Sequence, residues 1–238
     1  MMNSNSRSDS DRMEHDHPQC ASCPFPLEER LCRNEQGLAP AGCPTRDSEI
    51  VEEVRDRYGQ AELAEFARQA SIQEAQGYQG RCPGNLSPRP FKPRLLEIAE
   101  FAEKMEYGRL GLVFCVGLAR EARKVADFLS ERGFEVVSVI CKAGRIPKEE
   151  LGVRDDQKIV PGSPEAMCNP LLQAITLNRS KTEFNIVMGL CVGHDSIFLK
   201  NSDAYCTVLA AKDRPTGHNP LAAVYTLDSY YRHIREEE

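Results

Sequence analysis

The sequence has no tryptophan, and only 7% of its residues are aromatic, which disfavours recognition of bases or sugars by stacking on aromatic rings. It also has no excess of basic residues, because 30 Lys and Arg stand against 36 Asp and Glu and give a formal charge of -6. A protein that binds nucleic acid needs cationic side chains to neutralise phosphates. Nucleic acid is therefore not an expected partner.

Long apolar runs are missing too, since no stretch approaches the roughly 18 residues that span a bilayer. Residues 1–18 are rich in Ser, Asn, Asp and Arg, too polar for a secretion signal, and we expect them to form a disordered tail. These features predict a cytoplasmic protein without a membrane partner. The G-x-G-x-x-G, Walker and G-x-S-x-G motifs are also absent, which disfavours dinucleotide-dependent, P-loop and serine hydrolase chemistry.

Cysteine, by contrast, is abundant, with ten residues. In a reducing compartment thiols persist, so metal binding explains them better than disulfides do. Four cysteines spaced C-x2-C-x8-C-x10-C fall within residues 19–45, a segment rich in Pro and Gly that has no core to fold on. Such spacing predicts a metal-binding module that folds on its metal, and it leaves zinc and an iron–sulfur cluster open. The predicted ligands are Cys20, Cys23, Cys32 and Cys43.

The rest of the chain divides into a helical segment with a linker, residues 46–92, and a longer region, residues 93–238, in which helical and strand patterns alternate. We expect a helical break near Gly59, and we leave Cys82 in the linker unassigned. The alternation predicts an α/β fold with a doubly wound, mostly parallel sheet and Rossmann-like layers. Predicted helices cover residues 95–105, 117–130, 165–178 (interrupted at Pro170) and 221–225, and predicted strands cover 110–116, 134–141, 184–190 and 205–210.

A second set of cysteines lies where these strands end. Cys115, Cys141 and Cys191 each stand at the carboxyl end of a predicted parallel strand, and Cys168 lies where the chain can reach the same edge. Parallel sheets bind ligands at this edge, so we expect the four thiols to converge on a second metal or redox site. The alternative for any one of them is a small buried hydrophobic residue, which is our reading of Cys206.

Polar residues gather at the same edge of the predicted sheet. Imidazoles transfer protons near pH 7 and cationic side chains hold anions. The residues predicted to act in catalysis are His194, Asp195, His218 and Lys142, and those predicted to bind substrate are Arg120, Arg145, Lys212, Arg214 and Asn219. For each single Lys or Arg, a solvated loop position is the plainer reading.

Several motifs occur together and in order along the chain: the Cys-x-x-Cys at Cys20, FCVGLAREA at 114–122, EAMCNP at 165–170, GLCVGHDS at 189–196 and KDRPTGHNPLAA at 212–223. With these motifs the chain resembles the uncharacterised cysteine-rich family usually labelled "metal-binding protein", which is found mostly in anaerobic bacteria and archaea. The resemblance implies metal binding and carries no activity with it.

From the residues we expect an iron–sulfur enzyme in which Cys115, Cys141 and Cys191, with or without Cys168, hold a [4Fe–4S] cluster that acts on a small anionic or sulfur-containing substrate. An electron donor is a further expected partner. One alternative is a non-catalytic zinc-binding or redox-sensing protein. Another is an interaction module built on the N-terminal cysteines.

Overall fold

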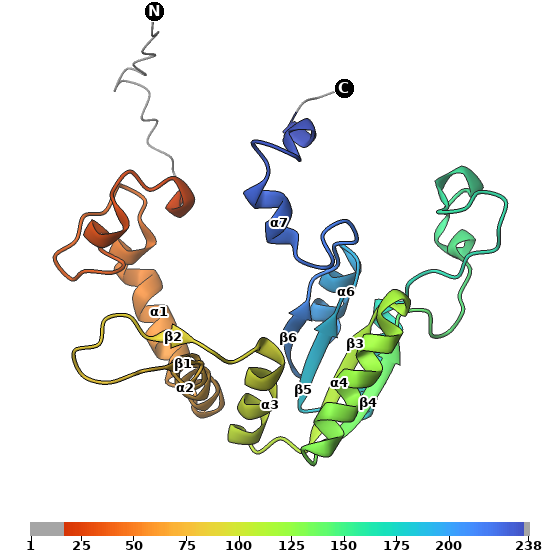
Figure 1. Cartoon of the computed structure of the whole chain (residues 1–238), viewed down its shortest axis with the longest axis horizontal. Helices are drawn as coiled ribbons and strands as arrows, with labels where there is room; N and C mark the ends of the chain where they lie inside the picture. Colours follow the sequence, from red (N-terminus) through yellow and green to blue (C-terminus); the bar gives the residue numbers. More distant parts are fainter. Residues whose placement is uncertain (1–16, 236–238) are drawn as a thin grey trace, which may run out of the picture. The chain divides into compact units, whose positions relative to one another are not determined.

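The computed structural model describes residues 17–235 (Figure 1), so most of the predicted tail lies outside the described residues. The chain divides into two compact units, residues 1–68 and residues 69–238, which we call unit 1 and unit 2. This division falls within α2 (Ala61–Gln76), whereas sequence analysis placed the start of the α/β domain at residue 93.

The described part of unit 1 holds three short 3-10 turns (Cys20–Ser22, Leu27–Glu29 and Pro44–Arg46), then α1 (Ser48–Tyr58) and the start of α2. The Asp47 side chain caps α1 by accepting a hydrogen bond from the Ile50 N–H at 3.1 Å. The predicted break near Gly59 is confirmed. Among the described residues of unit 1, Ala39 is the only buried hydrophobic side chain. Apolar burial therefore contributes little to holding this unit together.

Unit 2 contains a four-stranded, fully parallel sheet in the order β4-β3-β5-β6. The α/β class and the parallel sheet are therefore confirmed. Every residue of β5 is buried, and the larger aliphatic side chains of β3 are fully buried, each contributing about 1.5–3 kcal/mol to folding. The strands are β3 (Arg109–Phe114), β4 (Glu135–Ile140), β5 (Phe184–Met188) and β6 (Tyr205–Ala210); the helices are α3 (Arg94–Lys104), α4 (Ala119–Glu131), α5 (Pro170–Arg179), α6 (His194–Asn201) and α7 (Pro220–Tyr225).

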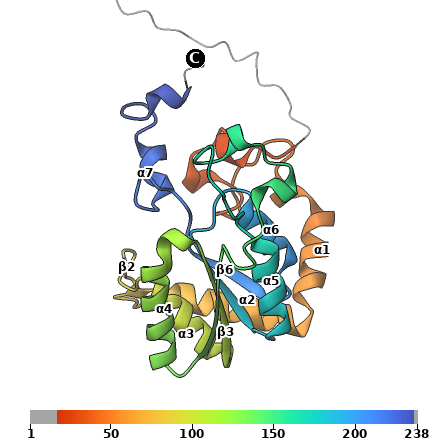
Figure 2. The ribbon, with the colours of Figure 1, turned by 90° about the vertical axis from the view of Figure 1, so that its right-hand side faces the viewer.

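The strand order reverses between β3 and β5. From β3 the chain crosses through α4 to β4, and from β5 it moves the other way, through α6 to β6. Figure 2 shows α4 on one side of the sheet and α5 and α6 on the other. The carboxyl ends of β3 and β5, which are adjacent strands, thus lie at the point where the order reverses.

Three sequence predictions need correction. The helix predicted from residue 165 begins at Pro170, because the proline fits the first helical turn and the Asn169 side chain caps it by accepting the Leu172 N–H at 3.0 Å. The linker contains a short antiparallel pair, β1 (Tyr78–Gln79) and β2 (Arg89–Pro90). Helix α6 follows β5 directly and was not predicted.

An arm formed by residues 145–166 connects β4 to α5 (Figure 1). Ion pairs hold it: Lys148 pairs with Glu165, and the Lys158 ammonium pairs with Glu149 and, at 3.0 Å, with Asp155. The Lys148 ammonium and the Val160 N–H, both hydrogen-bonded to the Glu165 carboxylate, lower its pKa to about 2. In the described part of the chain, no helix has the length and apolar character needed to cross a membrane.

Candidate thiolate site at the sheet edge

Four cysteines from four separate segments of unit 2 line one narrow cavity. Cys115 follows β3, Cys141 follows β4, Cys191 lies three residues beyond β5, and Cys168 precedes α5. The cavity leaves no room for a sphere the size of a water molecule. The structure therefore brings together the three thiols predicted at strand ends and Cys168, which was predicted to reach the same edge of the sheet.

Backbone hydrogen bonds extend the order of the sheet into this cavity. The Cys115 N–H donates to the carbonyl of Met188 at 3.2 Å, and the Cys141 N–H donates to the carbonyl of Phe114 at 2.9 Å. The Cys141 carbonyl in turn accepts the Asn169 N–H at 2.7 Å, which holds the segment next to Cys168. Paired backbone groups thus fix the positions from which the thiols project.

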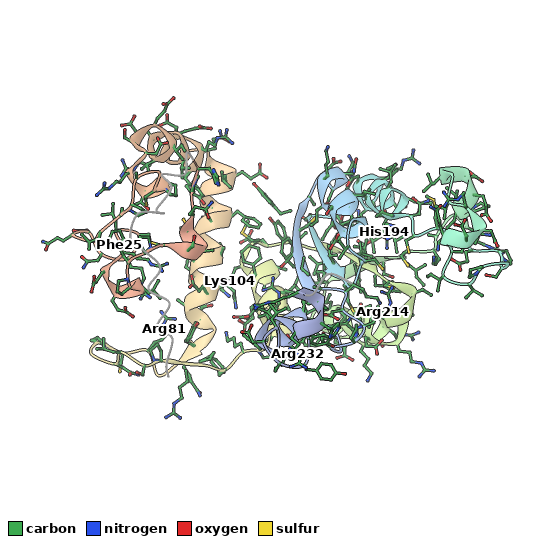
Figure 3. The ribbon with its side chains drawn as sticks, turned by 90° about the horizontal axis from the view of Figure 1, so that it is seen from above. Phe25, Arg81, Lys104, His194, Arg214 and Arg232 are labelled. Atoms are coloured by element: carbon green, nitrogen blue, oxygen red, sulfur yellow. The ribbon has the colours of Figure 1, made fainter. Side chains whose placement is uncertain are left out.

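Nitrogen donors face the sulfur atoms. The Lys212 ammonium lies 3.2 Å from the Cys115 sulfur, and the Val116 N–H donates to the Cys141 sulfur at 3.2 Å. The Arg214 guanidinium lies 3.4 Å from the Cys191 sulfur. Figure 3 labels Arg214 and His194, which both belong to unit 2. Positive charge and N–H donors favour thiolates over thiols.

The neighbouring Cys141 and Cys168 thiols shift each other's ionisation in opposite directions. The interaction with Cys141 lowers the pKa of Cys168 to about 5, with the nearby charges of Lys142 and His194 acting in the same direction. The interaction with Cys168, together with burial, raises the pKa of Cys141. The two thiols therefore titrate as a coupled pair, in which the Cys168 sulfur is the more acidic group.

Two buried side-chain atoms, Gln173 Oε1 and His194 Nδ1, have no hydrogen-bond partner within residues 17–235, and both residues line this cavity. The Gln173 amide is oriented by its Nε2, which donates to the carbonyls of Val139 at 2.7 Å and Phe114 at 3.4 Å. Its oxygen therefore has to be the unpaired atom. Gln173 was not predicted as a site residue; the available signal was its place one helical turn before Leu177, on the face of α5 that is buried.

Three of the cationic residues predicted at this edge of the sheet have other contacts. Lys212 and Arg214, expected to bind substrate, contact thiols. The ammonium of Lys142, expected to act in catalysis, donates to the Ala166 carbonyl at 2.6 Å. Arg120 and Arg145 are not among the residues that line the cavity. Of this group, the structure thus directs Lys212, Arg214 and Lys142 toward the thiol site itself.

The remaining predicted polar residues form local contacts. Asp195 accepts the Ser196 N–H at 2.8 Å, and Nδ1 of His218 accepts the Asp213 N–H at 3.1 Å. The backbone N–H of Asn219 donates to the Thr216 hydroxyl at 3.2 Å. Because His194 Nδ1 has no partner among the described residues, the structure shows no His194–Asp195 pair through that atom.

The other cysteines separate into two kinds. Cys82 is exposed, and Cys206 is half-buried in β6, packed against the core beside the thiol cavity without lining it. In unit 1, a cavity of about 480 Å³ is lined by all four cysteines of the predicted module together with His17. There the Cys23 N–H donates to the Cys20 carbonyl at 3.4 Å, which closes the Cys-x-x-Cys turn, and Arg30 binds the carbonyls of Phe25 and Cys23.

The cysteines that line one cavity are not arranged as the coordination sphere of a metal ion. Over residues 17–235, no three or more His, Cys, Asp or Glu side chains stand at the mutual spacing that a metal ion requires. In the thiol cavity the sulfur atoms instead contact one another and the surrounding nitrogen donors. Metal binding would therefore require the side chains to turn toward a common centre.

Comparison with known proteins identifies a family whose function is not known. A family model described as "Protein of unknown function (DUF1847)" matches residues 43–209. An uncharacterised protein of Methanocaldococcus jannaschii is 40% identical over 183 residues, which cover 77% of this chain and 86% of the relative. No solved structure matches. The matched region includes the whole thiol cavity but only Cys43 of the N-terminal four.

Proposed function

The chain belongs to this family of proteins of unknown function, and we propose that it is a metal–thiolate protein whose unit 2 holds an iron–sulfur cluster at the thiol cavity. The observation that carries the proposal is the meeting of Cys115, Cys141, Cys168 and Cys191 in one cavity at the carboxyl edge of a parallel sheet. Thiolates are the ligands of iron–sulfur clusters.

The position of the cavity supports a functional site over chance burial of cysteines. In doubly wound sheets, the layering predicted from the sequence, ligands bind where the strand order reverses. Here the reversal lies between β3 and β5, and these strands lead directly to Cys115 and Cys191. Two cysteines used only as small hydrophobic residues would have no reason to share this location.

The charges around the cavity suit an anionic metal–thiolate centre. Lys142, Lys212 and Arg214 lie near the sulfur atoms and would offset their negative charge. Hydrogen bonds to ligating sulfur also tune the reduction potential of such centres. The donor set therefore fits a [4Fe–4S] cluster, while the tight space requires the thiols to move apart on loading.

For the activity, we propose chemistry on a small anionic or sulfur-containing substrate. A cluster with one iron free of cysteine would supply a Lewis acid. The protein would supply the charge of Lys142 and Lys212 and a hydrogen-bond donor to the substrate, the Nε2–H of His218. That nitrogen carries the hydrogen because Nδ1 of His218 accepts the Asp213 N–H. In unit 1, the shared cavity supports a zinc ion or a second cluster at the four cysteines, where it would contribute the folding energy that the apolar core does not.

The decisive experiment measures iron, zinc and acid-labile sulfide, with a visible spectrum, in protein purified without oxygen. We expect iron and sulfide in near-equal amounts and broad absorbance near roughly 400 nm. Cys191→Ser should remove about four iron atoms per chain, whereas Cys206→Ser, a half-buried cysteine outside the cavity, should remove none. A colourless protein with one zinc, unchanged by Cys191→Ser, would contradict the proposal.

A second candidate, a redox-sensing dithiol, is favoured by one observation: Cys141 and Cys168 line the same narrow cavity and their ionisations are coupled. Attack of one thiolate on an external disulfide, followed by attack of the other, would form the Cys141–Cys168 disulfide and release two external thiols. Treating metal-free protein with oxidised glutathione and mapping disulfides by mass spectrometry tests this. The candidate is rejected if Cys168→Ser has the same disulfides as the wild type.

A further inference from the structure

The proposal that cysteines ligate the metal gives no role to one side chain of the thiol cavity, His194. His194 lines this cavity, and its Nδ1 is a buried atom that finds no partner within residues 17–235. A buried polar atom without a partner is destabilising, and in native proteins it points to an unseen water or ion. The cavity has no room for a water-sized sphere, which favours a smaller ion as that partner.

The local backbone presents this imidazole together with a cysteine. The sequence Cys191-Val192-Gly193-His194 has the Cys-x-x-His spacing of a metal-binding turn. The His194 N–H donates to the Cys191 carbonyl at 2.9 Å, which closes the turn, and Gly193 takes the positive φ of +84° that this needs. The same closure occurs at Cys20-x-x-Cys23, where the Cys23 N–H reaches the Cys20 carbonyl.

A second unpaired atom supports an occupant of the cavity. Gln173 is fully buried, and its Oε1 is the other buried side-chain N or O atom in the described chain that lacks a partner. Both residues line one cavity, which is also lined by four thiols. A bare ion is smaller than water and can enter where water cannot.

We propose that His194 is a metal ligand through Nδ1, so that the centre in unit 2 has a mixed set of cysteine sulfur and one imidazole nitrogen. Cys191 and His194 supply two ligands from one turn, and Cys168, whose environment includes His194, supplies a third from the segment before α5. This inference rests on the proposed metal site and reassigns His194 from proton transfer to metal binding. The ligating imidazole is neutral, so it adds no charge to the thiolate set.

The test uses Zn²⁺ and the full chain carrying Cys20→Ser and Cys23→Ser, which removes the N-terminal site. We expect one zinc per chain and an X-ray absorption spectrum with sulfur at about 2.3 Å and nitrogen at about 2.0–2.1 Å. His194→Ala should remove the nitrogen signal and weaken Zn²⁺ binding by about 100-fold or more. His218→Ala is the matched control, because His218 does not line the cavity, and it should leave both unchanged.

A further variant keeps the result interpretable if His194→Ala disturbs the fold. His194→Cys retains a ligand at the same position and should restore Zn²⁺ binding with an all-sulfur spectrum. One zinc bound by sulfur alone in the parent protein, unchanged in His194→Ala, would overturn the histidine ligand and leave the thiolate centre standing. Failure of the parent protein to bind any zinc, together with an iron-free native protein, would overturn both proposals.

Discussion

Replacing Gly111 by alanine provides a strict test of the packing that sets the sheet edge. Gly111 lies in the central strand β3, and a methyl group built there would stand 2.0 Å from the Asn185 amide oxygen and 2.5 Å from a Leu177 methyl carbon. Asn185 cannot easily move, because it accepts a hydrogen bond from Thr182 at 2.8 Å and donates one to Ser202 at 2.7 Å. Both Asn185 and Leu177 are fully buried.

Two costs therefore combine. Overpacking a core costs about 1–3 kcal/mol, and displacing the Asn185 amide leaves buried polar groups unpaired at about 1–3 kcal/mol. Gly111→Ala should thus lower the free energy of unfolding by roughly 2–6 kcal/mol, which lowers Tm by roughly 4–24 °C at about 2–4 °C per kcal/mol. Chemical denaturation and thermal unfolding followed by circular dichroism measure both quantities.

Gly108→Ala is the matched control three residues earlier. There the nearest atom to a new methyl group is a Glu183 carboxylate oxygen at 3.8 Å, an ordinary contact at an exposed position. This variant should be neutral or up to about 1 kcal/mol more stable, since alanine restricts the unfolded chain. Combining Gly111→Ala with Asn185→Ala should cost less than the sum of the single changes. Equal stability of Gly111→Ala and Gly108→Ala would refute the reasoning.

Three other outcomes follow from the contacts described above. Lys212→Met removes the ammonium beside the Cys115 sulfur and should weaken metal retention about 10–100-fold in competition with a chelator, whereas Lys200→Met, exposed on α6, should not. Because the Lys148 ion pair lowers the Glu165 pKa to about 2, its stabilisation of the arm should be complete above about pH 4.3, the unfolded pKa, and lost as pH falls through about 2. Hydrogen exchange should show this loss in the wild type and a smaller pH step in Glu165→Gln, where Glu149 and Asp155, whose pKa values Lys158 lowers, still titrate. A chain of residues 69–238 should keep the thermal unfolding of unit 2; loss of the cooperative transition would contradict the division into two units.

The sequence by itself determined the α/β class, the helical break near Gly59 and the strand ends at which Cys115, Cys141 and Cys191 stand. The local pattern of apolar residues is enough to predict these features, because its spacing differs between helices and strands and it is interrupted where an element ends. It did not determine where α5 begins, since the helical pattern runs through residues 165–169 and only the Pro170 ring and the Asn169 cap decide the boundary.

Only the tertiary structure decided what the residues at the sheet edge contact. Sequence distance does not reveal that Lys212 reaches Cys115, 97 positions away, so a residue expected to hold a substrate was found against a thiol. The sequence also gave no sign that Gln173 and His194 would line the same cavity, or that each would have a buried side-chain atom without a partner among the described residues. Strand order and the packing of α5 against the sheet bring these groups together, and both depend on contacts between segments that are far apart in the chain.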